Sequence, residues 1–103
     1  MGLWIREKLP TANNQSLLSR KPEIAFYANM RFVATPPVSN TAQLVDYMKR
    51  ERISYFALDS RITPKEYPSL SELLDPSKVM TDFNLIHDVN YLGNHVLLYR
   101  LKN

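Results

Sequence analysis

The spacing of hydrophobic and polar positions changes several times along this chain and predicts alternating helices and strands. Apolar residues near the start recur at helical spacing until Pro10, which cannot continue a helix. Asn40 with Gln43 three residues later is typical of a capping box at the start of a helix. Ser69 with Glu72 repeats this pattern and predicts a second capped helix. In chain order, the predicted elements are helix 3–9, strand 15–19, helix 23–28, strand 31–35, helix 41–52, strand 53–58, helix 70–75 and strands 83–90 and 96–101.

The apolar positions within these elements also predict which side chains face the core. In helix 41–52, Leu44, Val45 and Met48 form an inward stripe. In helix 23–28, Ile24 is expected to face inward together with Tyr27 or Ala28. Strand 83–90 alternates strictly, which places Phe83, Leu85, His87 and Val89 on one face.

The order of the elements predicts an α/β domain, a layered sandwich with helices on the faces of a mixed sheet. The segment from Tyr55 to Leu58 is apolar throughout, which is typical of a strand buried on both faces of a parallel sheet. A strand, an amphipathic helix and a second strand in this order form a right-handed crossover, so about three strands are expected to pair in parallel. Gly93-Asn94 between the last two strand patterns predicts a C-terminal antiparallel hairpin.

Length and composition are those of one domain. The 103 residues, 45% of them hydrophobic, are enough for a substantial core. The longest apolar runs are about five residues, as in 24–28, whereas a membrane span needs about 20, so the chain is expected to be a soluble unit. Its abrupt helical start suggests that residues 1–103 are a domain cut from something longer.

Charge and residue usage exclude several function classes. The net charge of +3 is too small for the dense basic stripe of a nucleic-acid-binding protein, so no nucleic-acid partner is predicted. The chain has no cysteine, which excludes disulfides and thiol catalysis. Gly2 and Gly93 are the only glycines, so a phosphate-binding glycine loop is excluded. His87 and His95 are the only histidines and lack a third ligand with suitable spacing, so neither a metal nor another cofactor is predicted.

One cluster of charged residues is a candidate anion or ligand site. Arg20 and Lys21 follow the first predicted strand, and Asp59 and Arg61 follow the third. In open α/β sheets ligands bind outside the carboxyl ends of the strands, so these four side chains would hold a phosphate or an acidic sugar. The position in the fold is an analogy, and a salt-bridged cluster of loops is the favoured interpretation.

Two further features have a functional and a structural interpretation. Tyr27 is the best candidate for stacking against a sugar, with Trp4, Phe26 and Phe56 as weaker ones, although core packing is the more frequent role of such side chains. The basic segment 49–52 would suit an anionic lipid surface, yet it also fits the solvated face of an amphipathic helix.

The order of several short motifs resembles the soluble C-terminal domain of polytopic glycosyltransferases of the protein-O-mannosyltransferase-like superfamily. The motifs are Leu3-Trp-Ile-Arg-Glu-Lys-Leu-Pro10, Ser19-Arg-Lys-Pro22, Ala25-Phe-Tyr27, Leu44-Val-Asp-Tyr-Met48, Asp59-Ser-Arg61, Leu74-Asp-Pro76 and Val96-Leu-Leu-Tyr-Arg-Leu101. One departure lies at 29–31, where the family often has a glycine before the arginine.

The resemblance implies on which side of the membrane the domain lies and that catalysis takes place in another part of the protein. Members of this superfamily take sugars from polyprenyl-phosphate donors and transfer them on the outer side of the membrane, with catalytic acidic residues near the N-terminus of the whole protein. No catalytic residue carries over to this chain. The resemblance therefore implies an accessory extracytoplasmic domain that packs on the transmembrane part of its parent and helps to shape the site of an acceptor or lipid-linked sugar.

Two other functions stay open. The chain would alternatively be a free-standing regulatory α/β domain that binds an anion or another ligand, or a small hydrolase with a catalytic carboxylate at Asp59. No preformed pocket is visible in the sequence, so sugars or lipid phosphates are expected to bind the isolated domain at best weakly.

Overall fold

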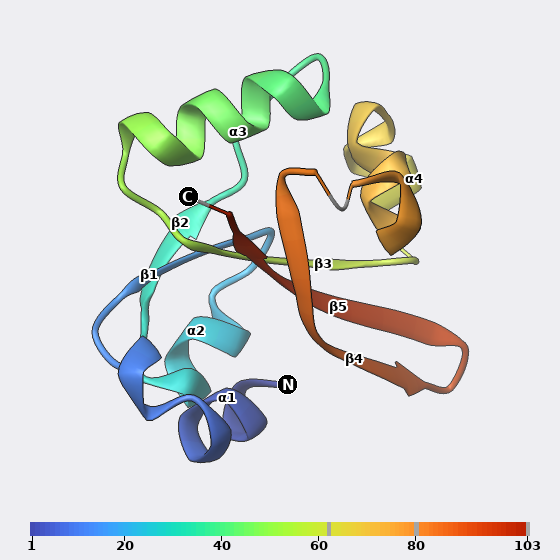
Figure 1. Cartoon of the computed structure of the whole chain (residues 1–103). Coiled ribbons are helices and arrows are strands. Elements are labelled where there is room, and N and C mark those ends of the chain that lie inside the picture. Colours follow the sequence, from blue (N-terminus) through green and yellow to red (C-terminus); the bar gives the residue numbers. More distant parts are fainter. Residues whose placement is uncertain (62, 80, 103) are drawn as a thin grey trace.

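A mixed sheet runs through the middle of the domain (Figure 1). The structure is a computed structural model and describes residues 1–61, 63–79 and 81–102. In this part of the chain the sheet has five strands in the order β2-β1-β3-β5-β4. The strands are β1 (Ser16–Ser19), β2 (Arg31–Ala34), β3 (Tyr55–Asp59), β4 (Phe83–Tyr91) and β5 (Asn94–Leu101). The helices are α1 (Gly2–Lys8), α2 (Glu23–Ala28), α3 (Thr41–Arg50) and α4 (Thr63–Glu66), with 3₁₀ helices η1 (Pro10–Ala12), η2 (Pro68–Leu74) and η3 (Pro76–Lys78).

The pairing of the strands confirms a mixed α/β domain. Strand β1 pairs in parallel with β2 on one side and with β3 on the other. Strand β5 pairs antiparallel with β3 and with β4. The chain therefore leaves β1 towards one edge of the sheet and returns to β3 on the opposite side of β1. The carboxyl ends of β1 and β3 form the switch point at which open α/β sheets bind ligands.

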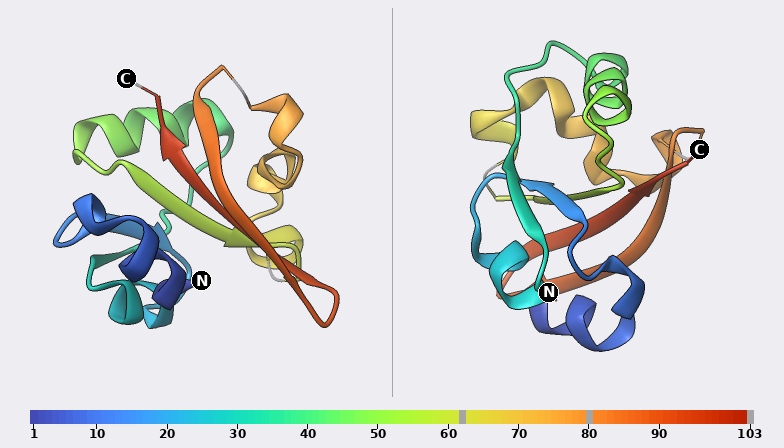
Figure 2. Two further views of the ribbon diagram at one scale, coloured as in Figure 1. Left: turned by 60° about the horizontal axis from the view of Figure 1, so that its bottom comes forward. Right: turned by 90° about the vertical axis from the view of Figure 1, so that its left-hand side faces the viewer.

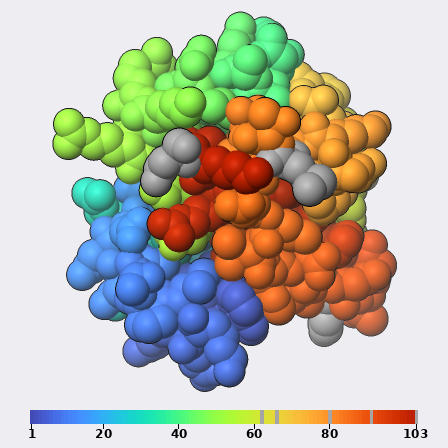
Figure 3. All heavy atoms as spheres, in the orientation of Figure 1, coloured from blue at the N-terminus to red at the C-terminus, as the bar shows by residue number. Residues whose placement is uncertain are grey.

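Helices cover both faces of the sheet and enclose two separate cores. Figures 1 and 2 show α1 and α2 on one side and α3 on the other, and the space-filling view in Figure 3 places these regions at opposite ends. On β3, Phe56 and Leu58 face the core under α3 and η2, whereas Tyr55 and Ala57 face the core under α1 and α2. The prediction of a strand buried on both faces is confirmed. None of the helices in the described residues is long and apolar enough to cross a membrane.

Helix α3 begins as its capping residues predict. The side chain of Asn40 accepts a hydrogen bond of 2.9 Å from the backbone N–H of Gln43, and the Gln43 side chain accepts one from the N–H of Ser39. Leu44 and Met48 are buried against the sheet as expected. The N-terminal cap and the buried face of α3 are therefore both as the sequence predicts.

The second predicted capping box is wrong. Residues 68–74 form a 3₁₀ helix, and Ser69 caps nothing because its hydroxyl donates to the carbonyl of Val38 at 2.7 Å. The Glu72 carboxylate accepts a hydrogen bond from the hydroxyl of Thr41. Both side chains therefore tie η2 to the segment that enters α3, and long-range contacts decide their role.

Two predicted inward faces agree with the structure only in part. In α2, Ala28 is buried and Ile24 packs partly buried against the core as predicted, and Ala25 joins them, whereas Tyr27 is 52% exposed. Small alanines face inward because α1 packs closely on α2. In β4 the register shifts between Leu85 and His87, so the strict alternation ends there and Leu85 is 38% exposed.

The turn between α2 and β2 contains a residue in the left-handed conformation. Asn29 ends α2 in the left-handed conformation, with φ 61° and ψ 41°. Glycine adopts this conformation most easily, and asparagine is the residue that most often replaces it. This turn is therefore formed without a glycine.

The β4–β5 hairpin closes through a tight turn whose two central residues both have positive φ. Leu92 has φ 51° and Gly93 has φ 80°, and Tyr91 pairs with Asn94 across the turn. The predicted hairpin is confirmed, although Gly93 is the second turn residue and Asn94 already belongs to β5. Leucine is a poor residue for the left-handed region, and it is 81% exposed at this projecting tip.

Leu92→Asn is expected to stabilise the domain by about 1 kcal/mol, because asparagine tolerates the left-handed backbone that leucine pays for in strain. The free energy of unfolding from urea denaturation measures the effect. Leu92→Ala is the control, since it removes the same exposed side chain without improving the backbone, and it should change little. Equal stability of the asparagine and alanine variants would contradict the assignment of strain.

Tyr99 on β5 fixes η2 to the sheet. Its side chain is 1% exposed, and its hydroxyl donates a hydrogen bond to the carbonyl of Leu73. Burial raises the pKa of Tyr99 to about 12, with smaller contributions from the negative charges of Asp75 and Asp88. The folded state therefore keeps the phenol neutral well above its ordinary titration range.

Stability is expected to fall as the pH rises from about 10 to about 12, because the unfolded chain releases the Tyr99 proton near 10 and the folded chain only near 12. The loss from this group amounts to about 2–3 kcal/mol. Tyr99→Phe should cost about 1 kcal/mol at neutral pH, through the lost hydrogen bond, and should remove this part of the alkaline loss. Urea unfolding of both proteins across this pH range tests it, and identical pH profiles would refute it.

Candidate functional site

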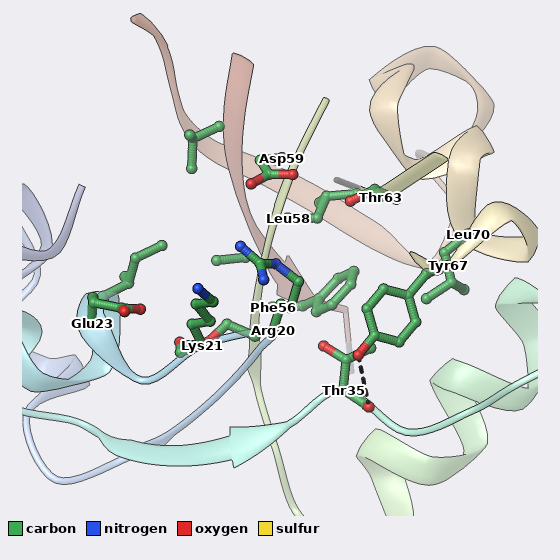
Figure 4. A pocket seen from close by; sticks show the side chains of 14 residues that line it. Arg20, Lys21, Glu23, Thr35, Phe56, Leu58, Asp59, Thr63, Tyr67 and Leu70 are labelled. Atoms are coloured by element: carbon green, nitrogen blue, oxygen red, sulfur yellow. Dashed lines mark hydrogen bonds between the residues drawn. The ribbon is translucent and has the colours of Figure 1, made fainter. Parts of the chain in front are cut away.

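A pocket of about 290 Å³ opens where β1 and β3 end (Figure 4). Its walls come from the loop after β1, the end of β3, the start of α2, the end of β2 and the segment α4–η2. This is the switch point of the sheet, where two neighbouring crossovers diverge to opposite faces. The expectation that the domain has no preformed pocket is therefore wrong.

The end of β1 presents two cationic side chains to this pocket. Ser19 is buried, and its hydroxyl donates a hydrogen bond of 2.8 Å to the carbonyl of Lys21. The Ser19 carbonyl accepts a bond of 3.1 Å from the N–H of Thr35, which joins the loop to the end of β2. These bonds hold the backbone that carries Arg20 and Lys21, whose head groups point into the pocket in Figure 4.

The end of β3 contributes a carboxylate. Asp59 is the last residue of β3 and lies half-buried opposite Val96 of β5. The ladder continues one residue further, because the Ser60 N–H donates to the His95 carbonyl and the Ser60 hydroxyl accepts from the His95 N–H, both at 2.8 Å. The backbone at Asp59 is therefore held by pairing with β5 both before and after this residue.

The floor of the pocket is apolar. Phe56, Leu58 and Leu70 line it, and all three belong to the buried core between the sheet and α3. Tyr67 forms one wall, and its hydroxyl lies 3.5 Å from the carbonyl oxygen of Thr35. A few polar groups above an apolar base are the usual composition of a small-molecule site.

Charged side chains of both signs line the mouth of the pocket. Arg20 and Lys21 supply positive charge, and Glu23 and Asp59 supply negative charge. Glu23 was not predicted as a site residue. Its place in the sequence, two residues after Lys21 and at the start of α2, is the signal that could have identified it. Tyr67 was also missed, because nothing in the local sequence places it near β1.

Three of the four residues predicted for the anion cluster line the pocket, and Arg61 does not. The backbone N–H of Arg61 donates to the Asn94 side chain at 3.2 Å, and its guanidinium donates to the Leu92 carbonyl at 3.4 Å. Both partners lie at the turn of the β4–β5 hairpin, so Arg61 anchors this turn. The prediction that Arg61 joins Arg20, Lys21 and Asp59 is therefore wrong.

Of the four aromatic candidates, Phe56 lines the pocket, and Trp4, Phe26 and Tyr27 lie elsewhere. Tyr27 and Phe26 form an edge-to-face pair on α2, with ring centroids 5.3 Å apart, and both are largely exposed. Neither is among the described residues that line the pocket. Trp4 stacks on His87 at 3.8 Å and nearly parallel, which docks α1 against β4, and Phe56 is buried in the pocket floor. Tyr27 keeps the exposure that sugar stacking requires.

The two histidines have separate partners. His87 stacks on Trp4, whereas the His95 imidazole lies 3.4 Å from the Asp88 carboxylate at the surface. Across 1–61, 63–79 and 81–102, no group of three histidine, aspartate or glutamate side chains is placed to hold a metal ion.

Residues typical of covalent catalysis are scarce among the described residues around the pocket. Its described lining residues include no histidine and no cysteine. The only serine among them, Ser19, is engaged with a backbone carbonyl. A nucleophile with an adjacent base, the usual arrangement for covalent catalysis, is not formed by these residues.

No protein-family model, curated protein or solved structure matches the chain. The resemblance to the glycosyltransferase domain therefore stays a prediction.

Proposed function

We propose that this chain is a binding domain whose pocket at the ends of β1 and β3 holds a small organic anion. The observation that carries the proposal is the placement of Arg20 and Lys21 at the mouth of a pocket with an apolar floor. The anionic group bonds to the guanidinium and the ammonium, and the remainder of the ligand lies on Phe56 and its neighbours. The Ser19 hydroxyl keeps the cationic loop in place without a ligand.

At the level of the whole protein, we propose an accessory extracytoplasmic domain of a membrane glycosyltransferase that uses a polyprenyl-phosphate-linked sugar. The order of motifs from Leu3 to Leu101 supports this proposal. A second support is the exposed apolar surface near the first helix, where Leu3 is 56% and Phe26 76% exposed. This surface is available to pack on the transmembrane part of the parent, and Tyr27 is available to stack on a sugar of the acceptor or donor. In this proposal the domain is a layered α/β sandwich whose parallel strands carry the pocket, and catalysis lies in the membrane part.

Binding of 4-methylpentanoate, a carboxylate with an aliphatic tail, tests the pocket. We expect saturable binding by isothermal titration calorimetry, with chemical shift changes in ¹⁵N-labelled protein confined to the ends of β1 and β3. Arg20→Ala should weaken binding roughly 10- to 100-fold, because a hydrogen bond to a charged group is worth about 1.5–3 kcal/mol.

Arg61→Ala is the matched control for this test, since Arg61 follows β3 but bonds to the hairpin turn. It should leave the affinity unchanged. Thermal unfolding of both variants shows that they fold. Equal losses of affinity in the two variants, or no binding of any carboxylate by the wild-type domain, would refute the anion pocket.

The glycosyltransferase proposal predicts the coding sequence around this domain. We expect the reading frame to continue upstream through several apolar segments of about 20 residues each. Sequencing the genomic DNA around the gene tests this expectation. A stop codon and a ribosome-binding site directly before Met1 would contradict it and favour a free-standing binding domain.

A further inference from the structure

Among the described residues, the pocket is lined by as many acidic as basic side chains, although a site for a simple anion needs only the basic ones. Glu23 and Asp59 line it together with Arg20 and Lys21, so two carboxylates accompany the two cations. Figure 4 shows the Asp59 carboxylate on one side of the cationic head groups and Glu23 on the other. A ligand with several negative charges meets repulsion from both carboxylates.

We propose that the ligand is an aliphatic zwitterion of the α-amino acid class, a proposal that rests on the anion pocket described above. Its carboxylate bonds to Arg20 and Lys21, and its ammonium group bonds to Asp59 or Glu23. Each ligand charge then has an opposite charge in the pocket. The four side chains can retain their present contacts, because a guanidinium has five donors and a carboxylate has several acceptor positions.

The apolar floor specifies the remainder of this ligand. Phe56, Leu58 and Leu70 line the pocket with apolar side chains that carry no polar group. An aliphatic side chain such as that of leucine gains about 0.8 kcal/mol for each buried CH₂ on such a surface, whereas the hydroxyls of a sugar would lose hydrogen bonds there. The floor therefore favours an aliphatic amino acid over a carbohydrate.

The size of the pocket agrees with this class of ligand. Cavities for drug-sized molecules span about 300–1,000 Å³, and this pocket, at about 290 Å³, lies at the lower end. A single amino acid fits such a volume, and a long lipid chain does not. Tyr67, which borders the floor, limits the length of the aliphatic side chain.

Calorimetry with four probes tests the inference: L-leucine, 4-methylpentanoate, isoamylamine and inorganic phosphate. Leucine and 4-methylpentanoate differ only in the ammonium group, and isoamylamine lacks the carboxylate. We expect leucine to bind roughly 10- to 100-fold more tightly than either single-charge analogue, because each removes one set of charged hydrogen bonds. Phosphate should be the weakest of the anions.

Two isosteric variants test the role of the carboxylates. Asp59→Asn and Glu23→Gln each remove one negative charge and keep the shape of the side chain. The variant that lacks the carboxylate bonded to the ligand ammonium should bind leucine and 4-methylpentanoate almost equally. Thermal unfolding checks that both variants fold. An unchanged preference for leucine in both variants would overturn the assignment of the ammonium to these carboxylates.

The remaining outcomes separate this inference from the proposed function. If 4-methylpentanoate binds as tightly as leucine, or phosphate binds more tightly than both, the zwitterion is wrong and the anion pocket stands. If none of the probes binds, both proposals fail.

Discussion

The architecture depends on one constraint, which is that β3 is apolar on both faces. Tyr55 and Ala57 need one covering layer, and Phe56 and Leu58 need another. A strand of this kind is stable only between two neighbours and under helices on both sides, because each uncovered face would leave hydrocarbon in water. The crossovers through α2 and α3 satisfy this requirement by diverging to opposite faces. The divergence of the chain on either side of β1 is also what leaves room for the pocket.

Sequence patterns predicted the elements where local physics decides. The strand ending at Asp59, the cap of α3 at Asn40 and the C-terminal hairpin all follow from short-range preferences. Predictions were wrong where distant contacts decide: Ser69 bonds to Val38, 31 residues away, in place of capping its own helix. The bulge in β4 is another case, since the local alternation of residues does not encode the twist that the partner strand imposes.

The candidate site could be predicted only in part, for a related reason. Parallel strands place their carboxyl ends at one edge, so Arg20, Lys21 and Asp59 were expected together and do line one pocket. Arg61 was wrongly included because the direction of its side chain depends on the hairpin turn that it contacts. Tyr67 was missed because only the tertiary fold brings η2 towards β2. The residues at the carboxyl ends of the strands can thus be predicted from the sequence, whereas the positions of the surrounding loop residues cannot.

The pocket shares its floor with the hydrophobic core. Phe56, Leu58 and Leu70 line the cavity and also belong to the packed cluster beneath α3. An occupant would add dispersion contacts to the parts of these side chains that face the cavity. A ligand that binds only the folded domain, as proposed above, would stabilise it by an amount that grows with the logarithm of the ligand concentration. In that proposal, the lifetime of the folded domain would follow the abundance of its ligand without any moving part.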